Sequence, residues 1–322
     1  MTLNHTNPLK IVLAGTDEFS KHHLEMLKNT KHKILGVITQ PDQPRGRGKY
    51  ITSSSMKTLS QKLHIPVFQP TSLNTIEFYN QIYNLHADII VVVSYGKIIP
   101  QSILNIFPLG GINVHTSLLP KWRGSSPIQS ALLNGDKRTG ITIIKINQKI
   151  DTGDIIYSLP CIIKKSDTSS SLQARLKKLS TQALIITLQN IYKNSYCLVR
   201  QSNLSTYSNK IKKQDAQLLW STDAIQLERS IRAYNPWPIC YFKVEKLFIK
   251  VWSANVINNF SQYKYNIGEI ILINKHGIQI KTKRNILNIT TVQLPGKKIM
   301  RAQNLYNSKN KWCVSGKQLN AS

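Results

Sequence analysis

The chain has 322 residues, with 43 Lys and Arg against 15 Asp and Glu, and its formal net charge is +28. This length allows two domains, each with its own buried core, and the excess of cations favours a polyanionic partner such as a nucleic acid. A genome biased toward Lys, Asn and Ile gives the same excess without any function. The four cysteines form no Cys-x-x-Cys pair, and the N-terminus lacks the apolar core of a signal peptide, so we expect a soluble cytoplasmic protein without a zinc site.

Strand-like and helix-like segments alternate over the first two thirds of the chain. The predicted strands are short apolar runs, at residues 9–14, 34–39, 87–93, 111–114, 141–146 and 155–163. Helical spacing is found at residues 17–28 and 169–192. This alternation predicts an α/β fold with a Rossmann-like, mainly parallel sheet covered by helices on both faces. The Gly-x-Gly-x-x-Gly pattern is absent after Gly15, since Asp17 and Phe19 occupy the positions of further glycines, and we expect no dinucleotide site.

The pattern changes in the last third of the chain. Residues 204–217 are polar and rich in lysine, which predicts a linker between domains at residues 1–203 and 218–322. Short strands with turn signals then follow, at residues 242–244, 247–252, 269–273, 276–281 and 286–290. Asn274-Lys-His-Gly277 predicts a hairpin turn, and the whole predicts a small antiparallel barrel.

An amide, an imidazole and a carboxylate are predicted to meet at the end of one strand. Asn113 and His115 lie two positions apart on an apolar run, so their side chains point to the same face, and Asp151 follows a later apolar run. An isolated Asn and His pair more often satisfies local backbone groups. Three such residues together suit acyl transfer through a tetrahedral, oxyanion-bearing intermediate, and we predict that all three are catalytic. The other seven histidines have no carboxylate at ligand spacing, so we expect no catalytic metal.

Five segments in chain order resemble the folate-dependent formyltransferase family. They are Ala14-Gly-Thr16, residues 39–49 with Thr-Gln-Pro-Asp and Gly-Arg-Gly-Lys, residues 113–124 with Asn-Val-His-Thr-Ser-Leu-Leu-Pro and Arg-Gly, Asp151-Thr-Gly-Asp154, and residues 232–238 with Asn-Pro-Trp-Pro. The cationic loop and the Asn-Pro-Trp-Pro segment favour the members of the family that act on tRNA. The resemblance implies a formyltransferase-type catalytic domain and a C-terminal OB-like β-barrel domain that binds tRNA.

The same resemblance implies a reaction and its partners. The formyl group of 10-formyltetrahydrofolate, the co-substrate, is expected to pass to the α-amine of methionyl-initiator tRNA, on a protein that acts as a monomer away from membranes. Asn113 and His115 would donate hydrogen bonds to the oxyanion. Asp151 would orient the imidazole and take the proton from the attacking amine. The expected folate-binding residues are Ser117, Leu118, Leu119 and Pro120, together with Ser94, Tyr95 and Gly96 of the loop after the strand at 87–93.

Five cations are predicted to contact tRNA: Arg45, Arg47, Lys49, Lys297 and Lys298. Arg47 stands at the loop arginine of the family and is expected to wedge against the first base pair of the acceptor stem, whereas Arg45 is an extra cation outside the family pattern. Trp237, between two prolines, is interpreted as a packing corner at the domain junction. Leu219 replaces an Asp that usually precedes the tryptophan of the linker, and residues 53–55 lack a proline that often follows the loop.

Three alternatives stay open on the sequence. An enzyme with the same centre formylates an amino-sugar nucleotide, but that substrate is too small to need a +28 surface. A purine-pathway glycinamide ribonucleotide formyltransferase would end near residue 200 and leave the last third of the chain unexplained. An RNA-binding protein that has lost catalysis has no reason to keep Asn113, His115 and Asp151 together.

Overall fold

The computed structural model describes residues 8–45, 50–258, 265–307 and 312–319. Two compact units make up the chain. The first contains Met1–Pro127, Arg138–Ile162 and Ala174–Asn209, and the second contains Ile128–Lys137, Ile163–Gln173 and Lys210–Ser322. Two short segments that precede residue 174 therefore belong to the second unit. The predicted division into 1–203, 204–217 and 218–322 does not include this detail, and its boundaries stay a prediction.

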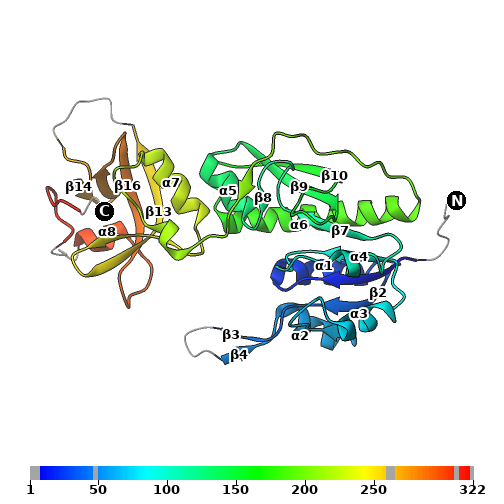
Figure 1. Ribbon diagram of the computed structural model, residues 1–322. Helices are drawn as coiled ribbons and strands as arrows, with labels where there is room; N and C mark the ends of the chain where they lie inside the picture. The colour runs from blue at the N-terminus through cyan, green and yellow to red at the C-terminus, as the bar shows by residue number, and fades with distance from the viewer. Residues whose placement is uncertain (1–7, 46–49, 259–264, 308–311, 320–322) are drawn as a thin grey trace. The chain divides into compact units, whose positions relative to one another are not determined.

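The first unit is built on a seven-stranded sheet in the order β10-β9-β7-β6-β1-β2-β5. Its strands are β1 (Lys10–Ala14), β2 (Lys33–Ile38), β5 (Val67–Phe68), β6 (Ile89–Val92), β7 (Gly111–His115), β9 (Arg138–Lys145) and β10 (Ile155–Ile162). The pairs β1–β2, β1–β6, β2–β5 and β6–β7 are parallel, while β9 pairs antiparallel with both β7 and β10. The mainly parallel sheet predicted from the sequence is confirmed, and Figure 1 shows its strands side by side.

Helices alternate with these strands along the chain, and a last helix follows β10, as the sequence predicts. They are α1 (Glu18–Lys28), α2 (Ser55–Lys62), α3 (Ile76–Tyr83), α4 (Gln101–Leu104), α5 (Pro127–Asn134) and α6 (Ser169–Tyr192). Asp17 caps α1 by accepting a hydrogen bond from the Ser20 N–H at 3.0 Å. Gly15 precedes this cap, and a Cβ there would lie 2.4 Å from the Ser20 Cβ, so the close approach of α1 to β1 requires a glycine. No helix in the described part of the chain is long and apolar enough to cross a membrane.

The strand order reverses between β1 and β6. From β1 the chain continues to β2 on one side of β1, and it later returns to form β6 on the other side. The carboxyl ends of β1 and β6 therefore lie at this reversal. Ligands of open α/β sheets bind at such a reversal. Three loops meet there on one acceptor: the Tyr95 carbonyl takes hydrogen bonds from Thr16 Oγ1 at 3.3 Å and from Gln40 Nε2 at 3.0 Å. Side-chain hydrogen bonds to one backbone carbonyl therefore join the loops at the edge of the sheet that the sequence predicts as the folate site.

The residues on either side of the cationic loop form a small ribbon. Strands β3 (Gln43–Arg45) and β4 (Tyr50–Thr52) pair antiparallel and extend away from the sheet (Figure 1). Asp42 anchors their base, because it accepts hydrogen bonds from Lys57 Nζ at 2.6 Å and from Gln69 Nε2 at 2.8 Å. The hydrogen bond from Lys57 lowers the pKa of the Asp42 carboxyl. Residues 46–49, with the predicted tRNA contacts Arg47 and Lys49, lie outside the described residues.

The second unit is an antiparallel sheet in the order β12-β13-β16-β15-β14, with β17 paired to β16. Its elements are α7 (Ala224–Ala233), β12 (Cys240–Val244), β13 (Leu247–Ile257), β14 (Ile270–Asn274), β15 (Gly277–Lys281), β16 (Ile286–Gln293), β17 (Met300–Arg301) and α8 (Ala302–Asn307). Asn274 pairs with Gly277, so the predicted hairpin turn is confirmed. All five predicted strands are present, and an antiparallel β domain follows from them.

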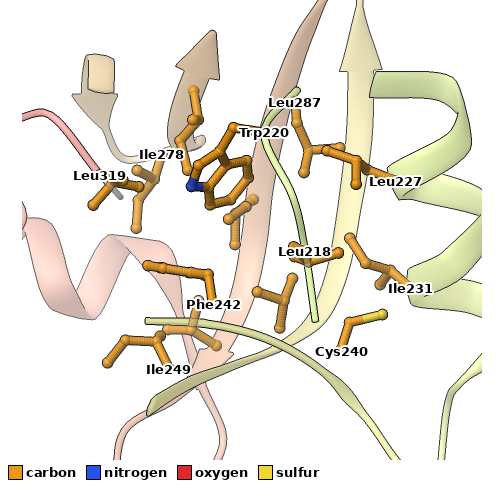
Figure 2. Packing of buried hydrophobic residues seen from close by; sticks show 14 of the residues in the cluster. Leu218, Trp220, Leu227, Ile231, Cys240, Phe242, Ile249, Ile278, Leu287 and Leu319 are labelled. Carbon is orange, nitrogen blue, oxygen red and sulfur yellow. The ribbon is translucent and has the colours of Figure 1, made fainter. Parts of the chain in front are cut away.

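A cluster of buried aromatic and aliphatic side chains forms the core of this unit (Figure 2). Trp220 is completely buried, and its ring contacts that of Phe242 edge-on, with 5.3 Å between the ring centroids. Phe242 in turn contacts Trp312 at 5.8 Å. Leu219, the departure from the family pattern, is 42% exposed, so it changes the surface beside Trp220 and leaves this core intact.

Trp237 is 52% exposed, so its interpretation as a packing corner is wrong. Its neighbours Tyr234 and Ile239 are the residues that turn inward, with 7% and 5% of their surface exposed. The chain between α7 and β12 thus buries a residue on each side of the Asn-Pro-Trp-Pro segment and leaves the indole outside.

The two tryptophans give a matched test of this core. We expect Trp220→Ala to lower the free energy of unfolding by about 3–5 kcal/mol, because a large buried ring leaves a cavity that its neighbours fill only in part. Trp237→Ala should change it by no more than about 0.5 kcal/mol, as exposed positions do. Denaturant unfolding followed by circular dichroism measures both; equal losses in the two variants would contradict the assignment of Trp220 to the core.

Candidate active site

Strand β7 places Asn113 and His115 on one face of the sheet. Asn113 lies between Val92 of β6 and Ile144 of β9, and His115 pairs with Thr142 of β9. Alternation along the strand sends both polar side chains the same way. His115 is 5% exposed, so its ring is almost completely enclosed at the end of the strand.

Asp151 meets both residues, as the sequence predicts. Its Oδ1 accepts a hydrogen bond from Asn113 Nδ2 at 3.1 Å, and its Oδ2 lies 3.5 Å from His115 Nδ1. The backbone N–H of Gly124 also donates to Oδ2, at 2.8 Å. The Asp151 side chain is only 11% exposed, and a carboxylate so enclosed needs donors of this kind. The structure therefore brings Asn113, His115 and Asp151 together in one cluster.

Both ring nitrogens of His115 face oxygen acceptors. Nδ1 faces the Asp151 carboxylate, and Nε2 lies 2.9 Å from the carbonyl oxygen of Trp122. Only the doubly protonated ring can donate in both directions at once. Donation by His115 to a substrate oxygen must compete with the Trp122 carbonyl, whereas Asn113 has a second amide N–H besides the one that Asp151 accepts.

The segment after β7 forms a corner fixed by its own hydrogen bonds. Thr142 Oγ1 donates to the Ser117 carbonyl at 2.7 Å and accepts from the Leu119 N–H at 3.1 Å, while Ser117 Oγ donates to the Lys121 carbonyl at 2.5 Å. Ser117 and Leu119 are buried, and Leu118 and Pro120 are half-buried. Leu118 packs on Gly140, where a Cβ would lie 2.6 Å from its Cδ2. Among the four residues predicted to border the folate, Leu118 and Pro120 are therefore the two whose side chains are accessible to a ligand.

The loop after β6 also contains both exposed and buried residues. Ser94 and Gly96 are exposed, and both have left-handed backbones, with φ of 48° and 83°. The Tyr95 side chain is 2% exposed and packs in the core of the first unit, where burial raises its pKa to about 12. Any contribution of Tyr95 to the predicted folate site is therefore limited to its backbone.

Sequence reasoning missed Gln201, which the structure places in hydrogen-bond contact with the Asp151 backbone. Gln201 Nε2 donates to the Asp151 carbonyl at 2.9 Å and to the Gly153 carbonyl at 2.7 Å. A single glutamine in a polar segment carries no signal that could have identified it. Trp122 and Thr142 were also missed, because each contributes through a backbone carbonyl or a short hydroxyl contact that no motif marks.

The predicted tRNA contacts are partly described. Lys297 and Lys298 are exposed in the turn between β16 and β17, where Gln293 Nε2 donates to the Lys297 carbonyl at 2.9 Å. Arg45 ends β3. In the part of the chain that the structure describes, no group of three or more His, Cys, Asp or Glu side chains could hold a metal ion.

Comparison with known proteins identifies the family. The pattern described as formyl transferase matches residues 9–188, and the pattern described as the formyl transferase C-terminal domain matches residues 210–310. The chain belongs to the formyl transferase family. The resemblance seen in the sequence motifs is thereby confirmed, and so is the fold class of a formyltransferase sheet followed by a β domain.

Two bacterial relatives are similar in sequence to this chain over nearly its whole length. A methionyl-tRNA formyltransferase of Buchnera aphidicola subsp. Baizongia pistaciae is 75% identical over 99% of both chains, and one of Buchnera aphidicola subsp. Schizaphis graminum is 49% identical over 96% of this chain and 98% of the relative.

Two solved structures share the fold. The sugar 3N-formyl transferase WlaRD, in the presence of dTDP and 5-N-formyl-THF, has a TM-score of 0.66 at 21% identity and covers 90% of this chain and 99% of its own. HypX from Aquifex aeolicus, in complex with tetrahydrofolic acid, has a TM-score of 0.62 at 14% identity over 94% of this chain and 47% of that one.

The cluster predicts how three variants behave. We expect Asn113→Ala, His115→Ala and Asp151→Ala each to lower kcat for formyl transfer by at least about a hundredfold. The first two variants lose a donor to the oxyanion, which typically costs about 3–4 kcal/mol, and the third loses the proton acceptor. Steady-state kinetics measures the effect, with His276→Ala, an exposed residue of the β14–β15 turn, as the matched histidine control. A variant with near-normal kcat would remove its residue from the mechanism.

Proposed function

We propose that the chain transfers the formyl group of 10-formyltetrahydrofolate to the α-amine of methionyl-initiator tRNA, which gives N-formylmethionyl-tRNA for translation initiation. The strongest support is the 75% identity, over 99% of both chains, to a relative named methionyl-tRNA formyltransferase. The meeting of Asn113, His115 and Asp151 adds a centre suited to the chemistry. We also propose that the protein acts as a monomer in the cytoplasm.

The reaction needs a nucleophile, a stabilised oxyanion and a proton acceptor. The lone pair of the neutral α-amine attacks the formyl carbon, and the electrons of its C=O bond move onto the oxygen. Asn113 donates an amide N–H to this oxygen, and the His115 ring is a second donor when it leaves the Trp122 carbonyl. Asp151 takes the proton that the amine loses, directly or through a water. The oxyanion then re-forms the C=O bond as the bond from the formyl carbon to the folate nitrogen breaks. The electron pair of the broken bond stays on that nitrogen, and Asp151 returns the proton to it, directly or through a water.

The cofactor is a co-substrate that leaves deformylated, so this chain must bind it reversibly. The exposed backbone of Ser94 and Gly96 and the half-buried Leu118 and Pro120 are the groups proposed to contact it. Peptide N–H and C=O groups can pair with the edge of the pterin, while the apolar side chains pack against its ring. This division suits a ligand with a polar edge and an apolar face.

One assay separates this function from the closest alternative. Purified protein is supplied with 10-formyltetrahydrofolate and either methionyl-initiator tRNA or an amino-sugar nucleotide, and formylated product is measured. We expect product from the tRNA alone. Product from the sugar nucleotide alone would assign the chain to the sugar-modifying members of the family.

From the two exposed lysines of the β16–β17 turn we predict an effect on how tRNA affinity depends on salt concentration. Replacing Lys297 and Lys298 by Ala should weaken binding of any tRNA and lower the slope of log affinity against log salt by about 1–2, because each phosphate contact releases about one counterion. Filter binding between low and moderate salt measures the slope. An unchanged slope would show that these two lysines point away from the RNA.

The cationic loop predicts specificity. Arg47→Ala should lower kcat/KM for methionyl-initiator tRNA more than for a tRNA with a strong first acceptor-stem pair, because the arginine is expected to enter an opened pair. Steady-state kinetics on both tRNAs tests this, with Lys62→Ala on α2 as the control for loss of one exposed cation. An equal decrease of kcat/KM on both tRNAs would show that the loop makes only an electrostatic contact and does not contribute to specificity.

A further inference from the structure

Gln201 makes an unusually complete set of contacts for a single amide. Its Nε2 donates to two carbonyls, those of Asp151 and Gly153, at 2.9 and 2.7 Å. Its Oε1 accepts from two nitrogens of Arg123, Nε at 3.1 Å and Nη2 at 2.8 Å. Two donors and two acceptor sites are all that a glutamine side chain has, so every one of them is used. The residue is 8% exposed, which makes each of these hydrogen bonds costly to lose.

These contacts fix a turn that has little stability of its own. Asp151 has a left-handed backbone, with φ of 53°, and Gly153 is pressed so close to β9 that a Cβ would lie 1.6 Å from the Lys145 carbonyl. Gln201 bridges the carbonyls on both sides of Thr152 and so determines where the turn stands. The Asp151 carboxylate then reaches Asn113 and His115 from that position.

Arg123 connects the same amide to the other side of the carboxylate. Its guanidinium is held by Gln201, its backbone N–H donates to the Thr206 carbonyl at 2.9 Å, and the next residue, Gly124, donates its N–H to Asp151 Oδ2. Both parts of Asp151 are therefore connected to the dipeptide Arg123-Gly124. The Asp151 carbonyl is connected to Arg123 through Gln201, and the Asp151 carboxylate accepts directly from the Gly124 N–H. A shift of Gln201 would change both.

We propose that Gln201 is a positioning residue for the formyl transfer reaction, which sets the Asp151 carboxylate at the distance from Asn113 and His115 that catalysis needs. All of its hydrogen bonds go to Asp151, Gly153 and Arg123, so it acts through the position of Asp151. This role rests on the proposed function of the centre. A misplacement of about 1 Å at a reacting group can lower a rate about a hundredfold.

Two substitutions separate the contacts of Gln201. Gln201→Met keeps the length of the side chain and removes every hydrogen bond, whereas Gln201→Glu keeps an acceptor for Arg123 and removes both donors to the Asp151 turn. In the Glu variant the buried guanidinium keeps a partner, while the second carboxylate oxygen faces the Asp151 and Gly153 carbonyls without a hydrogen to donate. Gln189→Met, on the exposed side of α6, is the same exchange without these contacts.

We expect both Gln201 variants to lower kcat by about ten- to a hundredfold, with KM for either substrate changed less than about threefold, while Gln189→Met keeps the wild-type kcat. In the Asp151→Ala background, Gln201→Met should lower kcat no further than about twofold, because the group that it positions is gone. Losses that multiply in the double variant, or an unchanged kcat in the folded single variants, would overturn the positioning role.

A second measurement does not depend on activity. If Gln201 sets the position of Asp151, the hydrogen bond from the Gly124 N–H to Oδ2 should weaken in Gln201→Glu, and the Gly124 amide should exchange with deuterium at least about fivefold faster. The Val114 amide of β7 is the internal reference. Unchanged exchange at Gly124 would overturn the role even in a protein with no formyl transfer, whereas absence of transfer by the wild-type chain contradicts only the proposed function.

Discussion

The Asp151 carboxylate is the acceptor on which the centre depends. Asn113 and His115 come from β7 and Gly124 comes from β8, and each of the three directs a polar group at this one side chain. A carboxylate that is 11% exposed must be satisfied by donors, or its burial would cost several kcal/mol. The same three contacts that stabilise it also set the distances between the groups that the chemistry uses.

Backbone strain gathers around this carboxylate. Trp122 and Asp151 have left-handed φ angles of 61° and 53°, and Gly124 has 113°. Each such non-glycine residue costs about 1–3 kcal/mol and persists only where its surroundings hold it. Here the Trp122 carbonyl is turned toward His115 Nε2, and the Gly124 N–H is turned toward Asp151, so these two backbone groups point at the site from residues with positive φ. The angle is strained at Trp122 and is free of strain at the glycine.

The sequence predicted what depends on local patterns. Helix α6 was placed at its observed bounds, and the period of two along β7 put Asn113 and His115 on one face. Gln201 was not predicted, because its partners Asp151 and Arg123 lie 50 and 78 residues away in the sequence and no pattern of spacing connects them. Trp237 was misjudged for a similar reason: an apolar ring beside proline looks like core, and only the burial of Tyr234 and Ile239 shows that other residues fill that space.

Part of the segment predicted as a linker also contributes to the centre. Within this polar, lysine-rich segment, β11 (Tyr207–Ser208) pairs in parallel with β8 (Arg123–Gly124), whose Gly124 N–H contacts Asp151. Thr206 Oγ1 accepts the Trp122 N–H at 2.9 Å, so the strained residue beside His115 is held by the same stretch. A short polar strand carries no apolar signal, because its contribution is made through backbone groups. Residues 201–208 therefore both hold the catalytic loop and lead into the second unit, which begins again at Lys210.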